Sequence, residues 1–217
     1  MVHIYIGGDR SAVSDYRPIS LNFEISKQSE HVIAGYLRKV CDKNYWLCEG
    51  HHGFKEGYSC DCQVNTVRQD MAGSLDEVIF IYAIIIDFSK AFVLVPHDRL
   101  FTKLVASGVD SKVVVWVREF LVGRTERVRV GGQQSKEVKV NSSVPQGNVL
   151  CTLLFIVYLS DIWKNIDSSN RPFADYCTIY GKITNKNKIE NFRKDLDTLG
   201  ECAVKNGMKI NPGKIRQ

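Results

Sequence analysis

Apolar residues recur with a helical period in three long segments of the chain. The spacing predicts amphipathic helices over residues 26–43, 61–75 and 189–204. On this pattern, Val32 lies on the buried stripe of the first helix and Val64 on that of the second. Between these two helices, residues 51–59 form a turn-rich loop that contains two glycines.

A different pattern predicts strands. Residues 78–86 are almost all apolar and rich in β-branched side chains, which indicates a central strand buried on both faces and ending at Asp87. Residues 127–130 and 138–140 alternate in type around Gly131 and Gly132, and this favours a hairpin. Residues 173–180 read as two short strands that meet at Asp175.

The remaining segments complete a compact α+β domain. Two short helices are expected at residues 98–107 and 110–121, each followed closely by a glycine, and a buried helix is expected within 147–163. The sequence contains no low-complexity linker and no internal repeat. One α+β unit is therefore the predicted fold class.

Composition narrows the class of protein further. The 217 residues, 44% of them hydrophobic and 24% charged, are typical of a soluble globular chain with one domain or two tightly joined subdomains. Residues 182–216 carry nine basic and four acidic side chains, so this segment holds the whole net charge of +5. A basic stretch on a neutral body is weak evidence for a bound polyanion.

Neither secretion nor membrane insertion is expected. The N-terminus lacks the pattern of a signal peptide, and the longest apolar run, residues 78–86, is about half the length that spans a bilayer. The seven cysteines form no zinc-ligand pattern, since Cys60 and Cys62 have no second pair at suitable spacing. We therefore expect reduced thiols and an intracellular location, in the nucleus or the cytoplasm.

Two isolated carboxylates are candidates for chemistry. Asp87 follows an apolar strand, and Asp175 lies between two short strands. Two aspartates from distant segments are what a two-metal phosphoryl-transfer site requires. Their spacing alone, however, favours a simpler reading, in which Asp87 caps a helix and Asp175 belongs to a hairpin turn.

The surrounding motifs favour the metal site. Eight of them occur in a fixed order: Asp15–Leu21, His52–Gly57, Asp87–Phe92 with Val95–His97, Gly123–Val130, Ser143–Gly147, Leu153–Phe155, Phe173–Asp175 and Gly207–Pro212. From Asp15 to its end, the chain resembles the reverse transcriptase of a non-LTR retrotransposon of the jockey or CR1 type.

This resemblance implies an RNA-directed DNA polymerase with the right-hand fingers–palm architecture and an antiparallel palm sheet backed by helices. Residues 1–14 would be an N-terminal remnant, and residues 15–217 the reverse transcriptase domain, truncated before the thumb. Fingers would comprise about 15–77 and about 124–142, and the palm the remainder. The implied partners are an RNA template, a DNA primer and deoxynucleoside triphosphates, with two Mg²⁺ ions as cofactors.

The resemblance also assigns residues to roles. Asp87 and Asp175 match the catalytic, metal-binding aspartates. Phe92 matches the bulky residue that excludes a ribose 2′-hydroxyl, although a plain core aromatic is the alternative. The other expected nucleotide-binding residues are Gln146, Gly147, Lys55 and Lys214. Lys55 would point toward the triphosphate, or would be an ordinary solvated lysine, and Lys214 would help the pyrophosphate to leave.

Departures from the family pattern leave two functional hypotheses open. Tyr176 stands where the family has a second adjacent aspartate, and a neutral phenol is a poor Mg²⁺ ligand. Val93, Ser143 and the Cys151–Thr152 pair depart as well. The chain is then either a polymerase domain with impaired activity or a catalytically dead nucleic-acid-binding remnant. A translation product without any role is a third reading.

Overall fold

A computed structural model describes residues 1–44, 46, 50–76 and 79–212. The chain divides into two compact units. The first, here called the helical unit, comprises residues 1–44 and 92–158, and the second, the sheet unit, comprises 45–91 and 159–217. Helices and antiparallel strands occur together, so the predicted α+β class is confirmed.

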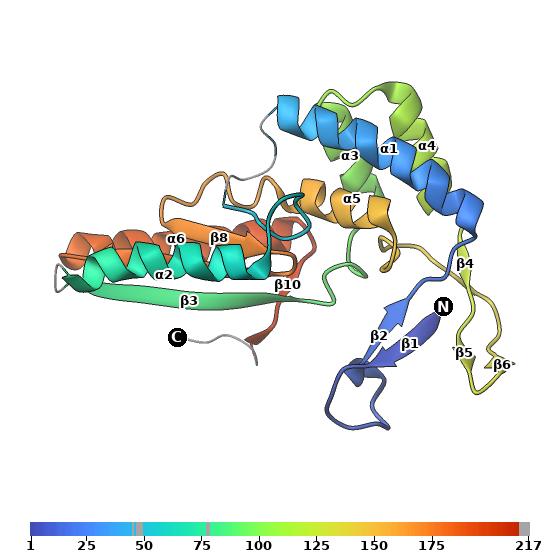
Figure 1. The fold of residues 1–217 in the computed structure, drawn as a ribbon, viewed down its shortest axis with the longest axis horizontal. Helices are drawn as coiled ribbons and strands as arrows, with labels where there is room; N and C mark the ends of the chain where they lie inside the picture. Colours follow the sequence, from blue (N-terminus) through green and yellow to red (C-terminus); the bar gives the residue numbers. More distant parts are fainter. Residues whose placement is uncertain (45, 47–49, 77–78, 213–217) are drawn as a thin grey trace. The chain divides into compact units, whose positions relative to one another are not determined.

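The sheet unit is built on a four-stranded antiparallel sheet with the order β10-β3-β9-β8 (Figure 1). Its strands are β3 (Phe80–Ser89), β8 (Ser169–Phe173), β9 (Tyr176–Ile183) and β10 (Lys209–Ile210). Strands β8 and β9 form the hairpin expected on either side of Asp175. Strand β10, which the sequence pattern did not predict, pairs with the end of β3.

Two long helices pack against this sheet. They are α2 (Cys60–Asp76) and α6 (Lys186–Lys205), and both overlap the predicted helices. Tyr180 of β9 bonds to Asp70 of α2, whereas a Cβ at the next residue, Gly181, would lie 3.4 Å from Phe192 of α6. Because successive residues of a strand face opposite sides, the two helices contact opposite faces of β9.

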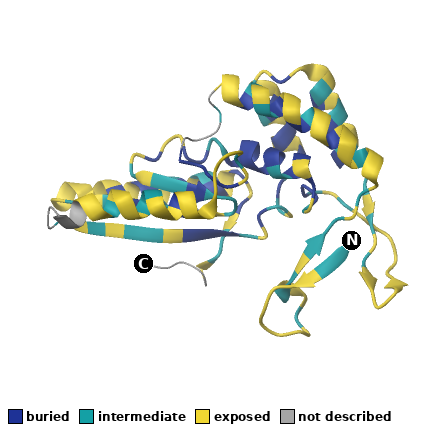
Figure 2. Ribbon diagram, viewed as in Figure 1, coloured by how far each residue is buried: buried dark blue, intermediate teal, exposed yellow. Residues whose placement is uncertain are grey.

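Strand β3 is less buried than its composition predicts. Only Ile86, Asp87 and Phe88 are buried, while Phe80 is 80% exposed (Figure 2). Among the described residues, β10 pairs with Phe88 and Ser89 alone, so the rest of that edge of β3 has no neighbouring strand. The strand also continues past Asp87, which lies within it and not at its end. The expectation of burial on both faces was wrong.

The helical unit contains four helices among its described residues: α1 (Glu24–Lys43), α3 (His97–Ala106), α4 (Ser111–Leu121) and α5 (Val149–Leu159). All overlap predicted helices. Most of α5 is buried, which agrees with its almost wholly apolar sequence. The Asp110 side chain caps α4 by accepting a hydrogen bond from the Lys112 N–H at 2.8 Å. No helix in the described part of the chain is both long and apolar enough to cross a membrane.

Short strand pairs complete the helical unit. They are β1 (Val2–Tyr5) with β2 (Tyr16–Ile19), β4 (Thr125–Glu126) with β7 (Val138–Lys139), and β5 (Arg129–Val130) with β6 (Gln133–Gln134). A short 3-10 helix, Val13–Asp15, precedes β2. The turn at Gly131–Gly132 is as predicted, but residues 138–139 pair with 125–126 and not with 127–130.

The buried faces of α1 and α2 differ from the predicted stripes. Val32 is 74% exposed and Val64 is 50% exposed, while Glu30 and Gln63 are buried. Both buried polar side chains donate or accept hydrogen bonds: Asn22 Nδ2 donates to Glu30, and Gln63 donates to the Arg171 carbonyl. The partner of Gln63 lies 108 residues away and that of Glu30 lies just before α1, so the period of apolar residues within each helix reveals neither contact.

Candidate active site and a cavity in the helical unit

The strand register brings the backbones of the two predicted metal-binding aspartates together. Asp87 of β3 lies opposite Tyr176 of β9, and the Phe88 N–H donates to the Asp175 carbonyl at 2.9 Å. Asp87 is 3% exposed, and Asp175 is half-buried in the turn that joins β8 to β9. Residues 88 positions apart in the chain thus become neighbours across one ladder.

The turn that carries Asp175 has a strained backbone. Phe173 pairs with Tyr176, so Ala174 and Asp175 alone connect the two strands. Ala174 has a φ of 55°, in the left-handed region that glycine adopts readily. A side chain there costs roughly 1–2 kcal/mol. Contacts elsewhere must offset this cost, as is common at functional sites.

Asn211 is a neighbour of Asp87 that the motif analysis did not single out. Its Nδ2 donates to Asp87 Oδ2 at 3.2 Å, and its backbone N–H donates to the Asp87 carbonyl at 2.8 Å. Two bonds from one residue fix both the strand and the carboxylate. The available signal was an Asn–Pro pair directly after a short strand-like segment, within the motif Gly207–Pro212.

The residues at this site fit a divalent cation by the type of their donors. Mg²⁺ is usually held by one or two carboxylates together with waters and substrate phosphates. Asp87 and Asp175 supply two carboxylates, and the structure adds no third, since the described residues contain no cluster of three or more acidic, histidine or cysteine side chains suited to a metal. Tyr176, opposite Asp87, is 37% exposed.

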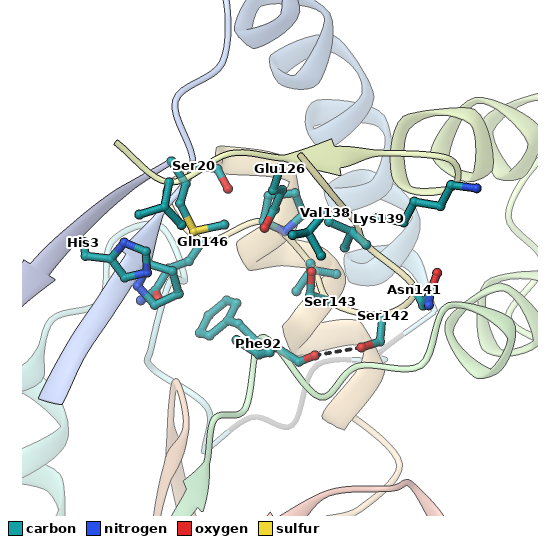
Figure 3. Close-up of a pocket in the computed structure, with 17 residues that line it drawn as sticks. His3, Ser20, Phe92, Glu126, Val138, Lys139, Asn141, Ser142, Ser143 and Gln146 are labelled. Atoms are coloured by element: carbon teal, nitrogen blue, oxygen red, sulfur yellow. Dashed lines mark hydrogen bonds between the residues drawn. The ribbon is translucent and has the colours of Figure 1, made fainter. Parts of the chain in front are cut away.

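A second feature is a cavity of about 420 Å³ in the helical unit. Phe92 and Gln146, two of the predicted nucleotide-binding residues, both line it (Figure 3). The ring of Phe92 stacks on that of Phe155 in α5, with centroids 4.2 Å apart and planes 25° apart. This stacking limits the movement of the Phe92 ring.

The segment 143–147 leads from this cavity to Gly147, whose backbone conformation favours glycine. The Gln146 carbonyl accepts a hydrogen bond from the Ser20 N–H at 2.9 Å. Gly147 has a φ of 106°, and a Cβ there would lie 3.0 Å from Ile19 Cγ2 and 3.4 Å from the Ser20 carbonyl oxygen. The glycine therefore allows segment 143–147 to pack against β2.

Replacing Gly147 with alanine is expected to lower the free energy of unfolding by about 1–3 kcal/mol, because the substitution combines an unfavourable φ with a steric contact. Gly132→Ala is the matched control, since Gly132 also has a positive φ, 83°, but open space around it. Urea unfolding of both variants measures the difference. Equal losses of stability would show that the contact with Ile19 is unimportant.

Of the two lysines predicted to bind the nucleotide, the structure describes only Lys55. Lys55 is half-buried in the sheet unit, with its Nζ 4.6 Å from the centre of the Tyr58 ring. This cation–π contact holds the ammonium group near its own loop. Lys214 lies outside the described residues. Asp87, Asp175 and Lys55 thus belong to the sheet unit, and Phe92, Gln146 and Gly147 to the helical unit.

Comparison with known proteins gives the family. The profile described as "Reverse transcriptase (RNA-dependent DNA polymerase)" matches residues 8–217, which is almost the whole chain. The chain therefore belongs to the reverse transcriptase family, as its motifs predicted.

Among individual proteins, the chain is similar to the polymerases of insect mobile elements. It is 27% identical to the "Probable RNA-directed DNA polymerase from transposon BS" of Drosophila melanogaster, over 96% of the chain and 24% of that protein. It is 25% identical to the "RNA-directed DNA polymerase from mobile element jockey" of the same species, over 99% of the chain and 24% of that protein. The chain spans about a quarter of the length of these relatives.

Solved structures give the same fold. The telomerase of Candida albicans, in complex with a fragment of telomeric RNA, superposes with a TM-score of 0.60 and 13% identity, over 86% of this chain and 34% of that one. Apo telomerase from Candida tropicalis gives the same TM-score over 89% of this chain and 36% of that one. At this identity the likeness is one of fold.

Proposed function

We propose that this chain acts as an RNA-directed DNA polymerase domain, which adds deoxynucleotides to a DNA primer paired with an RNA template. One observation carries the proposal within the chain itself. The β3–β9 register places Asp87 and Asp175, from segments far apart in the sequence, at adjacent positions of one antiparallel ladder. Membership of the reverse transcriptase family supports it independently.

In this proposal, four residues of the sheet unit act on the metal ions and the triphosphate. Bound divalent cations would stabilise the attacking and leaving oxygens of the nucleotidyl transfer. Asp87 and Asp175 would hold those ions, and Asn211 keeps the Asp87 carboxylate in a fixed position through its Nδ2–H. Lys55 contributes positive charge toward the triphosphate.

The helical unit would select the nucleotide. Phe92, held by its stacking on Phe155, excludes a ribose 2′-hydroxyl by steric contact. Gln146, which lines the cavity, and the adjacent Gly147 would line the path of the nucleotide and template. In the right-hand architecture of polymerases, the fingers would comprise residues about 15–77 and about 124–142. The palm would comprise the remainder of residues 15–217.

A second candidate function is nucleic-acid binding without turnover. Tyr176 lies directly opposite Asp87 in the ladder, where a carboxylate would complete the set of metal ligands, and it offers a phenol instead. The basic segment 182–216 would still contact phosphates, with an affinity that falls steeply as salt rises. This candidate needs the positive charge but neither aspartate.

Primer extension on an RNA template with Mg²⁺ distinguishes the two functions. We expect slow but measurable extension by the unmodified chain and none by Asp87→Asn, an isosteric variant without the negative charge. A labelled RNA–DNA hybrid, titrated at two salt concentrations, reports binding by both proteins. Binding without extension in both would establish the second function, and equal extension in both would contradict the proposed role of Asp87.

A further inference from the structure

Strand β8 is held along its length by a segment that precedes β3 in the chain, residues 50–70. β8 is an edge strand, and two of its carbonyl groups find partners in this segment. Gln63 Nε2 of α2 donates to the Arg171 carbonyl at 2.7 Å, and the His52 N–H donates to the Pro172 carbonyl at 3.3 Å. Gln63 is buried, and its Oε1 has no partner among the described residues, so this donation is its one described side-chain bond.

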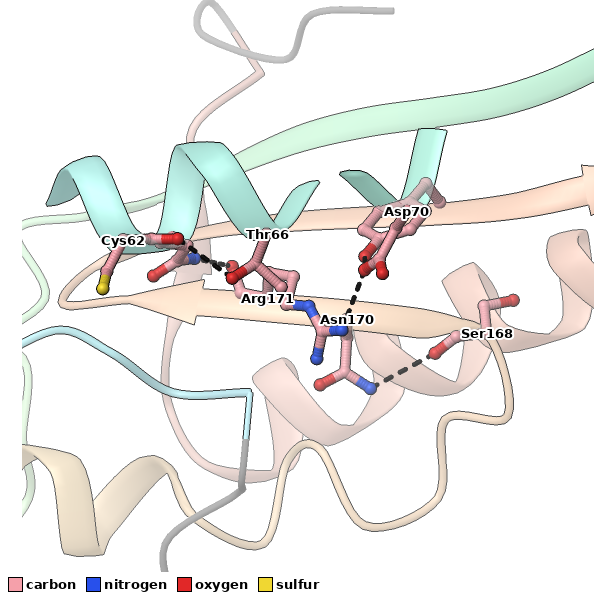
Figure 4. A network of polar contacts seen from close by, with 8 residues as sticks. Cys62, Thr66, Asp70, Ser168, Asn170 and Arg171 are labelled. Carbon is pink, nitrogen blue, oxygen red and sulfur yellow. Dashed lines mark hydrogen bonds and ion pairs between the residues drawn. The ribbon is translucent and has the colours of Figure 1, made fainter. Parts of the chain in front are cut away.

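A salt bridge between side chains also connects β8 to α2. Arg171 points from β8 toward α2, and its Nη2 lies 2.8 Å from Asp70 Oδ2 (Figure 4). The Tyr180 hydroxyl of β9 donates a hydrogen bond to the same carboxylate. Burial alone would raise the pKa of Asp70, but the hydrogen bonds from Tyr180 and Arg171 hold it below its ordinary value. Asp70 therefore ties both strands of the hairpin to α2.

The closest approach occurs at the turn itself. Gly53 is buried, and a Cβ at this position would lie 2.4 Å from the Ala174 nitrogen and 3.0 Å from the Phe173 carbonyl carbon. Both are backbone atoms, which cannot move aside as a side chain can. The loop thus packs directly on the residue whose φ is 55° and which immediately precedes Asp175.

We propose that Gly53 and Gln63 are positioning residues for Asp175. They fix the backbone of β8 and its turn, and thereby set the place at which the Asp175 carboxylate is presented beside β3. The inference rests on the proposed function, because it assigns to the turn the task of holding a metal ligand. Neither residue touches the metal or the nucleotide in this account.

The first test measures the turn without any metal. In the full chain, the Phe88 N–H is bonded to the Asp175 carbonyl, and the Asn211 N–H is bonded to the Asp87 carbonyl. Gly53→Ala should speed amide exchange at Phe88 by about tenfold and leave Asn211 unchanged. Gly73→Ala is the matched control, since Gly73 is an exposed residue of α2 with nothing within 4 Å of its added Cβ.

The second test measures Mn²⁺ affinity by electron paramagnetic resonance. Loss of an outer partner of a metal ligand typically weakens metal binding about 10- to 100-fold, and we expect a loss in this range for Gly53→Ala and none for Gly73→Ala. Gln63→Met, which has similar length but no N–H donor, should show a smaller loss in the same direction. This variant also tests the inference if Gly53→Ala fails to fold.

The possible outcomes separate the two claims. Unchanged exchange at Phe88 in both folded variants overturns the positioning role. Faster exchange with unchanged Mn²⁺ affinity overturns it as well, because the turn then moves without effect on the metal. If the unmodified chain binds Mn²⁺ no better than Asp175→Asn does, the proposed function fails, and the metal-positioning role fails with it, whatever the exchange rates.

Discussion

Replacing Tyr176 with aspartate is expected to increase primer extension by roughly 10²–10³, the usual cost of losing one preorganised stabilising group at an active site. The substitution puts an anionic oxygen in place of a neutral phenol, directly opposite Asp87 in the ladder. Tyr176 is 37% exposed, so the shorter side chain leaves no buried cavity behind it. Mn²⁺ affinity should rise in parallel, because the ion gains a charged ligand.

Tyr176→Phe is the control for this experiment, since it keeps the ring and adds no ligand. It should behave like the unmodified chain in both primer extension and Mn²⁺ binding. A double variant, Tyr176→Asp with Asp175→Asn, separates a gain of ligand number from a simple gain of charge. Equal activity of the aspartate and phenylalanine variants would show that the tyrosine is not the cause of any impairment.

Lowering the pH from about 6.5 to about 4 is expected to destabilise the chain through His51. This histidine is 3% exposed, and its Nε2 has no partner among the described residues. Burial, with smaller contributions from the positive charge of His52 and Lys55, lowers the pKa of His51 from 6.5 to about 4. The folded chain therefore resists protonation of a group that the unfolded chain protonates near pH 6.5.

Proton linkage gives the direction and the size of the change in the free energy of unfolding with pH. Between the two pKa values the unfolded state binds more protons, so the free energy of unfolding falls as the pH falls. A difference of about 2.5 pKa units corresponds to about 3 kcal/mol, nearly all of it lost by pH 4. Urea unfolding at several pH values measures this slope.

His51→Gln should flatten the pH dependence of stability in this range, whatever its effect on stability at pH 7. His31→Gln is the matched control, because His31 is exposed on α1. It should leave the slope unchanged. An undiminished slope in His51→Gln would assign the acid sensitivity to other groups.

Local signals in the sequence were sufficient to predict the elements around the candidate active site. The apolar run before Asp87 predicted β3, and the short alternating segments on either side of Asp175 predicted the β8–β9 hairpin. The pairing of these strands did not follow from their pattern. Nothing local specifies which distant strand β9 will join.

Longer-range contacts account for what the sequence did not predict. Gln63 is buried and donates to the Arg171 carbonyl, 108 residues away in the chain, whereas the hydrophobic period alone assigns a polar residue to the surface. The role of Asn211 depends on β10 pairing with β3, and β10 is only two residues long. The motif His52–Gly57 includes Gly53, but its close contact with the turn at Ala174 could not be predicted, because that turn lies more than a hundred residues further along the chain.

The unpaired edge of β3 has a consequence for work with the purified chain. From Phe80 to Ile85 this edge has no neighbouring strand among the described residues, and Phe80, Tyr82 and Ile85 expose large apolar side chains. Such an edge is a template for pairing with another chain. The same strand carries Asp87 near its other end, so self-association at high protein concentration would place a foreign strand on the element that carries a residue of the proposed metal site. Activity measured per molecule would then fall with concentration, and an assay in dilute solution reports the chemistry of the chain more faithfully than one in a concentrated sample.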